Sequence, residues 1–372
     1  MKEYSEVFVG LDVSKLKISV AVAAGGRSGE VRFFGDIDAS PAVVGSMVKK
    51  LAKPGVKLHF CYEAGPTGYE LYRQIVALGH HCVLVAPSLI PKRAGDRVKT
   101  NRRDALSLAK LHRAGELTPV WVPDREHEAM RDLVRAREGA MIALKRGRQQ
   151  LQAFLLRHGR LYTGRTLWSK AHLGWLCDQK FDHPAHQIVL AEYRHAIEEA
   201  QVRLERLTKL VAEAVASWSM APLVQAYQAM RGVSLLTAVT FAVEIGDVRR
   251  FGNPRQLMAY LGLVPSESST GERVRRGAIT KAGNNRARRA LIEGAWTYRF
   301  PARMSRLMQG RQGGLPKIVR EIAWKGQVRL CARYRKLTAA GKLKAVTVTA
   351  IAREMAAFLW AIGQEVTPVL GV

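Results

Sequence analysis

The sequence predicts a mixed α/β domain over residues 1–118, followed by two largely helical regions over residues 119–220 and 221–372. Three observations support this fold class. Short apolar runs alternate with helical patterns in the first region, apolar residues repeat every seven positions in the second, and amphipathic basic helices fill most of the third. A chain of 372 residues is long enough for two or three domains with separate cores.

The N-terminal region begins with three apolar runs, at 6–15, 17–24 and 29–37, that predict consecutive strands joined by short turns. Ser40 and Pro41 then mark the start of a helix, because they suit its cap and its first position. The remaining expected elements are a strand at 56–64, a helix at 67–79, a strand at 81–86 and a helix at 101–115. The order βββαβαβα is that of the ribonuclease H-like, or RuvC-like, fold.

Acidic residues lie near the ends of two of the predicted strands, and in this fold such residues converge on one edge of the sheet. They are Asp12 and Glu63, and Asp104 lies at the start of the last helix. Convergent carboxylates hold Mg²⁺ or Mn²⁺, which activate a water or hydroxyl and stabilise displacement at phosphorus. Turn chemistry offers a purely structural alternative for Asp12 and Glu63.

Position 101 lies one helical turn before Asp104 on the same face, and it is an asparagine. The carboxamide oxygen of Asn101 can contact a metal ion but brings no charge. Hard divalent cations are held chiefly by anionic oxygen, so we expect weakened metal binding.

Two long helices are expected in the helical middle of the chain. Residues 124–158 form an amphipathic stripe that Arg137 and Arg148 interrupt, and the second helix has a clearer heptad pattern. Its apolar positions are Leu190, Ile197, Leu204 and Val211, with Tyr193, Ala200, Leu207 and Ala214 at the second heptad position. The heptads allow either an antiparallel coiled-coil pair within the chain or dimerisation with a second subunit.

The segment between these helices mixes aromatic and basic side chains: Tyr162, Trp168 and Trp175 among Arg160, Arg165 and Lys170. Such a mixture could stack on unpaired bases, as in single-strand binders. A small helical cap with a tryptophan core is the commoner explanation and the one we favour.

The C-terminal region begins with a segment, residues 222–265, that resembles a helix-hairpin-helix unit with its turn at 232–234. Backbone amides of such a glycine turn approach a phosphate, although an ordinary helix-helix turn fits nearly as well. Helical patterns follow at 284–300, 315–341 and 347–366. Their basic faces could lie along a nucleic-acid backbone through Arg286, Arg288, Arg289, Arg329, Arg333 and Arg335.

Between these helical segments, the hydroxyl residues Ser266, Ser268, Ser269 and Thr270 precede Gly271 and a basic run. A serine can attack a phosphodiester only if positive charges offset the developing negative charge, and a glycine-flanked loop would let the hydroxyl reach the backbone. A polar turn before a basic helix is the simpler alternative. The candidate nucleic-acid-binding residues are Lys99, Arg102, Arg103, Arg273, Arg275, Arg276, Lys281, Arg286, Arg288 and Arg289.

The formal net charge is +28, from 59 Lys and Arg against 31 Asp and Glu, and it indicates a polyanionic partner, nucleic acid first. An anionic membrane is second, but no apolar run reaches the length of a membrane span and the N-terminus lacks the basic start of a signal peptide. We therefore expect a cytoplasmic, nucleoid-associated protein. The 4 cysteines include no CxxC pair, which argues against structural zinc and a disulfide framework.

Four motifs extend over nearly the whole chain: GLDVSK, CYEAGPTGYELYRQ, LVAPSLIPKRAGDRVKTNRRDALSLAKLHRAGELTPVWVP and the serine stretch. Together they resemble bacterial insertion-sequence transposases with a DEDD tetrad, a family that includes Piv-type DNA invertases and recombinases guided by a bridge RNA. The resemblance implies that the tetrad falls on Asp12, Glu63, position 101 and Asp104. The family usually has KTD where this chain has KTN, so Asn101 is a departure, either natural or an engineered change that silences the metal site.

The resemblance also implies that Ser269 attacks the DNA phosphate and becomes covalently attached, with Ser268 as its adjacent competitor and Ser266 and Thr270 less favoured. One active site would be built from two domains or from two subunits. The implied partners are donor and target DNA, a structured noncoding guide RNA and further copies of the chain, as a dimer or tetramer.

Two other functions remain open from the sequence. A RuvC-like metal-dependent junction nuclease would use water as its nucleophile and form no protein adduct. A catalytically silenced nucleic-acid-binding protein is favoured by Asn101. A sugar kinase or actin-like ATPase is excluded, because the sequence shows no second phosphate-binding glycine loop and such a protein has no use for a charge of +28.

Overall fold

The computed structural model describes residues 5–91, 100–271 and 273–366. The chain divides into two compact units, unit 1 up to Val122 and unit 2 from Pro123 onward, and each is described by itself. The predicted boundary at residue 118 lies close to this division. The predicted boundary at residue 220 does not separate units, because the ends of both long helices share a core with the helices that follow.

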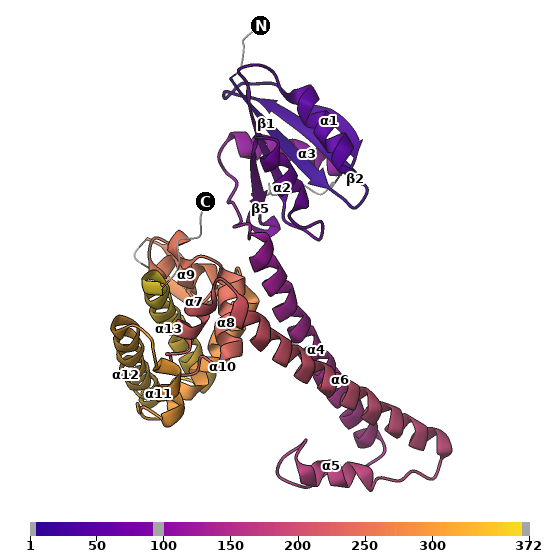
Figure 1. Ribbon diagram of the computed structural model, residues 1–372, viewed down its shortest axis with the longest axis vertical. Helices are drawn as coiled ribbons and strands as arrows, with labels where there is room; N and C mark the ends of the chain where they lie inside the picture. Colours follow the sequence, from indigo (N-terminus) through magenta and orange to yellow (C-terminus); the bar gives the residue numbers. More distant parts are fainter. Residues whose placement is uncertain (1–4, 92–99, 272, 367–372) are drawn as a thin grey trace. The chain divides into compact units, whose positions relative to one another are not determined.

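Unit 1 contains a five-stranded sheet of order β3-β2-β1-β4-β5 with helices on its faces (Figure 1). Strands β1, β4 and β5 are parallel, whereas β2 is antiparallel to both β1 and β3. The elements are β1 (Glu6–Val13), β2 (Lys17–Ala24), β3 (Val31–Asp38), α1 (Pro41–Leu51), β4 (Lys57–Glu63), α2 (Glu70–Ala77), β5 (His81–Val85) and α3 (Asn101–Arg113). The predicted α/β architecture and element order are confirmed.

The strands of unit 1 send alternate side chains into two separate cores. Val9 and Leu11 of β1 pack with residues of α1 and α2 on one face of the sheet. The opposite face is covered by α3, whose Ala105 and Ala109 pack against small residues of β2. Because alanine side chains meet at this contact, the backbone of α3 can lie close to the sheet.

Gly10 is the position in β1 that permits this close approach. A Cβ at Gly10 would lie 2.4 Å from both the Ala105 carbonyl oxygen and the Ala109 backbone nitrogen. Further along α3, the His112 ring contacts the Phe8 ring, with centroids 5.4 Å apart. Since later residues of α3 lie over earlier residues of β1, the helix runs antiparallel to the strand, and its first turn lies toward the carboxyl end of β1.

Unit 2 is helical apart from one hairpin, within the part of the chain that the structure describes. Its helices are α4 (Arg125–Arg157), α5 (Lys170–Cys177), α6 (Pro184–Ser217), α7 (Ala221–Tyr227), α8 (Leu235–Ile245), α9 (Pro254–Tyr260), α10 (Asn285–Ala295), α11 (Arg306–Gln312), α12 (Lys317–Ala339) and α13 (Lys344–Val366). The sequence did not predict α11. The hairpin consists of β6 (Pro265–Thr270) and β7 (Arg273–Ile279).

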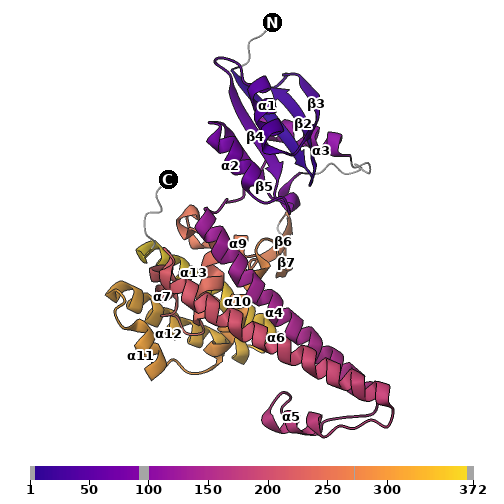
Figure 2. The ribbon, with the colours of Figure 1, turned by 45° about the vertical axis from the view of Figure 1, so that its right-hand side comes forward.

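The two long helices α4 and α6 lie side by side in the same chain (Figures 1 and 2). Arg137 of α4 donates to Thr208 of α6 at 2.9 Å, and Arg148 donates to Gln201 at 3.2 Å. Residue numbers rise along α4 while those of their partners on α6 fall, so the two helices are antiparallel. Of the two arrangements that the heptads allowed, packing within the chain is therefore present.

Helix α13 lies in the centre of the C-terminal core, and this corrects one sequence-based statement. The helix is long and apolar enough to cross a membrane by length and composition, so the expectation that no apolar run reaches this length was wrong. Its apolar residues Val348, Ile351 and Met355 are fully buried against neighbouring helices. The apolar composition is explained by this packing, because a core helix needs apolar residues wherever it contacts its neighbours.

The expected loop around the serine stretch is instead the antiparallel hairpin β6–β7. Gly271 has φ +59 at the turn, a conformation that favours glycine, and Val274 and Ile279 supply β-branched residues to the return strand. The expectation of a loop was wrong because both strands are largely exposed, so no alternation of apolar and polar residues revealed them.

The close approach at Gly10 predicts that Gly10→Ala loosens unit 1. The added methyl group would overlap the α3 backbone, and overpacking of this kind costs roughly 1–3 kcal/mol of unfolding free energy. Urea denaturation of the full chain, with amide hydrogen exchange followed in α3, measures the effect. Gly45→Ala in α1 is the matched control, because a Cβ there meets no atom within 4 Å, and it should be neutral or slightly stabilising. Equal protection of α3 in wild type and Gly10→Ala would contradict the packing argument.

Candidate active site

The carboxyl ends of β1 and β4 bring Asp12 and Glu63 to one edge of the sheet in unit 1. The two strands are parallel, and Leu11 pairs with Tyr62, so the next residues along both strands are neighbours. Strand alternation places Asp12 on the same face as Gly10, and Glu63 on the same face as Cys61, which packs against α3. Both carboxylates are partly exposed and lie on the face that α3 covers.

The first turn of α3 adds position 101 and Asp104 to this edge. Thr100 caps the helix by accepting a hydrogen bond from the Arg103 backbone nitrogen, and Asp104 is partly buried while Asn101 is exposed. Since α3 runs antiparallel to β1 with Ala105 over Gly10, this turn lies at the level of Asp12. The structure thus brings the four tetrad positions to one end of the sheet, which we call the acidic edge.

The acidic edge offers donors of the kind that hard divalent cations prefer. Three are carboxylates and one is a carboxamide, and oxygen donors of this type suit Mg²⁺ or Mn²⁺. Among the described residues, however, no three His, Cys, Asp or Glu side chains form a group close enough to hold one ion. The residues therefore fit a divalent cation in chemistry, but they do not form a compact cage of three anionic ligands.

Two of the predicted basic residues flank this edge. Arg102 lies over the Phe33 ring at 5.2 Å, and Arg103 follows it on the exposed side of α3. Lys99, the third basic residue predicted here, lies outside the described residues.

The hairpin β6–β7 in unit 2 separates the hydroxyl residues onto two faces. Residues that pair directly across an antiparallel ladder share a face, and alternate residues along each strand change face. Ser269 pairs with Val274 and Glu267 with Arg276, which places these four side chains on one face. Ser268 pairs with Arg275 and Thr270 with Arg273, so these four occupy the other face.

Ser269 lies next to a carboxylate on its own face. Its hydroxyl donates to Glu267 Oε1 at 2.9 Å, and Arg276 Nε donates to Glu267 Oε2 at 3.2 Å. The hydrogen bond from Ser269, and then the one from Arg276, lower the pKa of Glu267 below its usual value. The carboxylate is therefore ionised at neutral pH, and the Ser269 hydroxyl is one of its hydrogen-bond donors.

The opposite face of the hairpin is basic. Arg273 and Arg275 are exposed there beside Ser268, and no ion pair joins either arginine to a carboxylate among the described residues. Ser266 is engaged differently, because its hydroxyl donates to the Ala278 carbonyl at 3.1 Å. The two competing serines thus differ in surroundings: Ser269 has an anionic acceptor, whereas Ser268 has only cationic neighbours across the ladder.

Several predicted phosphate-binding arginines are held by the protein itself. Arg286 and Arg289 both donate to the Glu138 carboxylate on α4, the latter at 2.6 Å. Arg288 donates to the carbonyl oxygens of Leu261 and Ala282 at 2.8 and 2.9 Å. Arg288 thus joins the start of α10 to the two ends of the hairpin. Lys281 is exposed beside it, with φ +56.

The predicted helix-hairpin-helix turn has a packing role in the structure. Gly232 has φ +80, and a Cβ there would lie 2.2 Å from the Gly294 carbonyl oxygen of α10. Ser234 caps α8 by accepting from the Thr237 backbone nitrogen at 3.3 Å. These contacts explain the glycine and the serine by helix packing, and phosphate binding by the turn stays a prediction.

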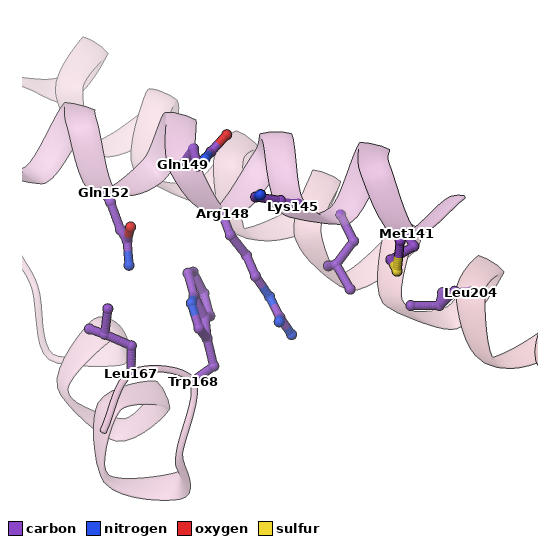
Figure 3. Close-up of a pocket in the computed structure, with 9 residues that line it drawn as sticks. Met141, Lys145, Arg148, Gln149, Gln152, Leu167, Trp168 and Leu204 are labelled. Carbon is purple, nitrogen blue, oxygen red and sulfur yellow. The ribbon is translucent and has the colours of Figure 1, made fainter. Parts of the chain in front are cut away.

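The aromatic segment before α5 packs on the long helices and leaves a cavity of about 480 Å³ (Figure 3). Trp168 and Trp175 pack against the core that Leu176 forms with α4 and α6. Arg148 lies over the Trp168 ring at 4.8 Å, and Figure 3 shows the indole beside this guanidinium. These contacts agree with a small helical cap that has a tryptophan core, and stacking of these rings on unpaired bases stays a prediction.

Sequence reasoning missed the carboxylates that organise unit 2: Glu138, Glu244 and Glu267. Only Glu267 had a local signal, because it stands two residues before Ser269, the spacing that places both side chains on one face of a strand. This spacing predicts a shared face only in a strand, and the segment was expected to be a loop. Glu138 and Glu244 meet their partners only through the tertiary fold.

Comparisons with known proteins connect both units to one class of protein. Residues 224–309 match the model of the transposase IS116/IS110/IS902 family, and residues 9–159 match a DEDD-type IS110 transposase model. The chain is 56% identical over 363 residues to the "Putative transposase y4qE" of Sinorhizobium fredii, covering 98% of this chain and 90% of that protein. It is 32% identical over 336 residues to the transposase for insertion sequence element IS1533 of Leptospira borgpetersenii, covering 89% and 96%.

Proposed function

This chain belongs to the IS110/IS116 family of insertion-sequence transposases, and on that premise we propose that it cleaves and rejoins DNA through a covalent bond between Ser269 and a DNA phosphate. Transposases act on DNA, so donor and target DNA are the substrates. The observation that carries the choice of nucleophile is the hydrogen bond from the Ser269 hydroxyl to Glu267. A serine hydroxyl is a poor nucleophile unless a neighbouring group accepts its proton, and Ser268 has no such neighbour across the ladder.

The acidic edge of unit 1 is proposed to serve the same reaction. Asp12, Glu63 and Asp104, with the carboxamide of Asn101, would hold a divalent cation such as Mg²⁺ or Mn²⁺, which supplies Lewis acidity toward a phosphate oxygen when bound. Asn101 lowers the anionic charge of the edge by one relative to the DEDD pattern. The carboxylates of this chain would therefore bind the divalent cation beside the scissile phosphate, with lower affinity than four carboxylates would give.

The basic residues are proposed to bind nucleic-acid backbones, and target choice is proposed to come from a structured noncoding RNA that pairs with both DNA partners. The net charge of +28 and the family support a large polyanionic ligand. The active form is proposed to be a homo-oligomer, a dimer or tetramer, working in the cytoplasm on nucleoid DNA.

Ser269→Ala should abolish the covalent protein–DNA adduct while leaving DNA binding intact, because only the attacking oxygen is lost. The measurement is a denaturing gel shift with a nicked DNA substrate that traps the intermediate, alongside a native binding assay. Ser268→Ala is the matched control, one residue away on the other face of the hairpin. An adduct that survives in Ser269→Ala and vanishes in Ser268→Ala would move the assignment.

Asn101→Asp should increase strand exchange that depends on Mg²⁺, because it restores the fourth carboxylate of the acidic edge. The titration of activity against Mg²⁺ should shift to lower concentration. Cleavage by Asn101→Asp with no protein adduct would favour a junction nuclease that uses water. Absence of cleavage in both forms would favour a nucleic-acid-binding protein without catalysis.

Ribonuclease treatment of the purified protein should abolish selective joining of donor and target DNA, because the guide would be lost while the basic surface stays. Readdition of the RNA transcribed from the DNA flanking the gene should restore joining, and a scrambled transcript is the control. Equal binding and joining before and after ribonuclease treatment would refute RNA guidance and leave the serine chemistry unaffected.

A further inference from the structure

We infer that Glu267 is a catalytic base, the group that accepts the Ser269 proton as the hydroxyl attacks the DNA phosphate. The inference rests on the proposed function, because it requires Ser269 to be the nucleophile. This carboxylate is not one of the four positions of the DEDD pattern. It is placed by the hairpin, where two residues of separation along β6 put both side chains on the same face.

The geometry satisfies the first requirement for a general base, which is direct reach to the proton it removes. The Ser269 hydroxyl donates to Glu267 Oε1 at 2.9 Å, so proton transfer needs no intervening water. Within the described hairpin Glu267 is the one carboxylate, and Glu272 at the turn lies outside the described residues. Ser268 and Thr270 share their face with Arg273 and Arg275, which donate protons and do not accept them.

Arg276 gives this pair a second function. It holds Glu267 Oε2 at 3.2 Å and keeps the carboxylate ionised before attack. When Glu267 takes up the Ser269 proton it becomes neutral, and the Arg276 guanidinium loses its ionic partner at the moment when negative charge grows on the phosphate. The positive charge of Arg276 then becomes available to the transition state, which is where it accelerates the reaction.

The arrival of DNA strengthens the base. A phosphodiester carries one negative charge, and a negative neighbour disfavours a second ionised group, so a bound phosphate acts to raise the pKa of Glu267. Free protein therefore holds Glu267 fully ionised, and the bound phosphate raises its basicity. Among the described residues, Ser269 and Arg276 are the groups that lower the pKa of Glu267, through the hydrogen bonds given above.

The step balances without a further reactant. The bond from Ser269 Oγ to phosphorus forms as its proton passes to Glu267, and the bond from phosphorus to the leaving deoxyribose oxygen breaks. That oxygen takes up one proton, returned from Glu267 through solvent, and becomes a free hydroxyl. Rejoining reverses these changes: the deoxyribose hydroxyl of the new strand attacks the phosphoserine, and Ser269 regains its proton.

The test is the rate of adduct formation on a nicked DNA substrate, measured from pH 5 to 9. Each variant is made both in the chain with Asn101 and in the Asn101→Asp background. Wild type should reach a plateau near neutral pH. Glu267→Gln keeps a hydrogen-bond acceptor for Ser269 but not a base, so it should be slower by about 10²–10⁴-fold at pH 7, with a rate that climbs with hydroxide. Glu267→Asp, which retains a carboxylate on a shorter side chain, should recover part of the rate.

Two arginine variants separate catalysis from a general loss of charge. Arg276→Gln should move the acidic limb of the profile to higher pH, because Glu267 loses the partner that keeps it ionised. Arg275→Gln removes the same charge from the opposite face of the hairpin and should leave the position of that limb unchanged. Equal shifts in both variants would show that only overall charge matters and would overturn the role of Arg276.

The outcomes distinguish the inference from the function on which it rests. Loss of the adduct in Ser269→Ala together with a wild-type rate and pH profile in Glu267→Gln would refute Glu267 as the base and leave the nucleophile standing. No adduct in either Asn101 background would overturn both. The inference would be established if Glu267→Gln binds DNA like wild type but forms the adduct slowly, at a rate that rises with hydroxide concentration. A merely structural role for Glu267 would not make the rate depend on hydroxide.

Discussion

One buried carboxylate, Glu244, connects the helices that hold the serine hairpin in unit 2. Its side chain is 1% exposed and accepts two hydrogen bonds from Arg135 of α4, at 2.8 and 3.0 Å. It also accepts one from Asn284 at 2.7 Å, and Asn284 in turn caps α10. Burial acts to raise the pKa of Glu244, but the hydrogen bonds from Arg135 and Asn284 outweigh it, and the pKa is lowered. Loss of Arg135 would leave a buried charge unpaired, the costly way to break such a pair.

Arginine–glutamate ion pairs recur in unit 2, and they determine which arginines are not already bound to a carboxylate of the protein. Glu138 binds Arg286 and Arg289, and Glu354 binds Arg329 and Arg333 on α12. These arginines seemed, from the sequence, to be equivalent members of a basic surface. In the fold these four arginines join helices, whereas Arg273 and Arg275 on the hairpin carry no ion pair among the described residues. Glu267 differs from these carboxylates because its side chain is more exposed and its second partner is a hydroxyl that can react.

The sequence predicted the elements of unit 1, because its strands are short apolar runs and its helices are marked by caps and amphipathic patterns. All five strands and the helices of unit 1 were expected within a few residues, and Asp12 and Glu63 were expected at one edge because adjacent parallel strands end there. The hairpin β6–β7 escaped prediction because neither strand has a buried face. Glu267 could not be assigned a role before the strand was known, since only strand alternation puts it beside Ser269. The partners of Glu244 lie 109 and 40 residues away, and no local pattern specifies contacts at such separations.

The residue that carries DNA can be identified directly by mass spectrometry. The covalent intermediate is trapped on a nicked substrate and digested with nuclease and protease. Fragmentation of the peptide that contains residues 265–271 then shows which residue carries the remaining nucleotide. Attachment at Ser269 is the expected result, because that hydroxyl alone in the described hairpin donates to a carboxylate. Attachment at Ser268, or at a residue outside this peptide, would contradict the assignment of the nucleophile and the role of Glu267 with it.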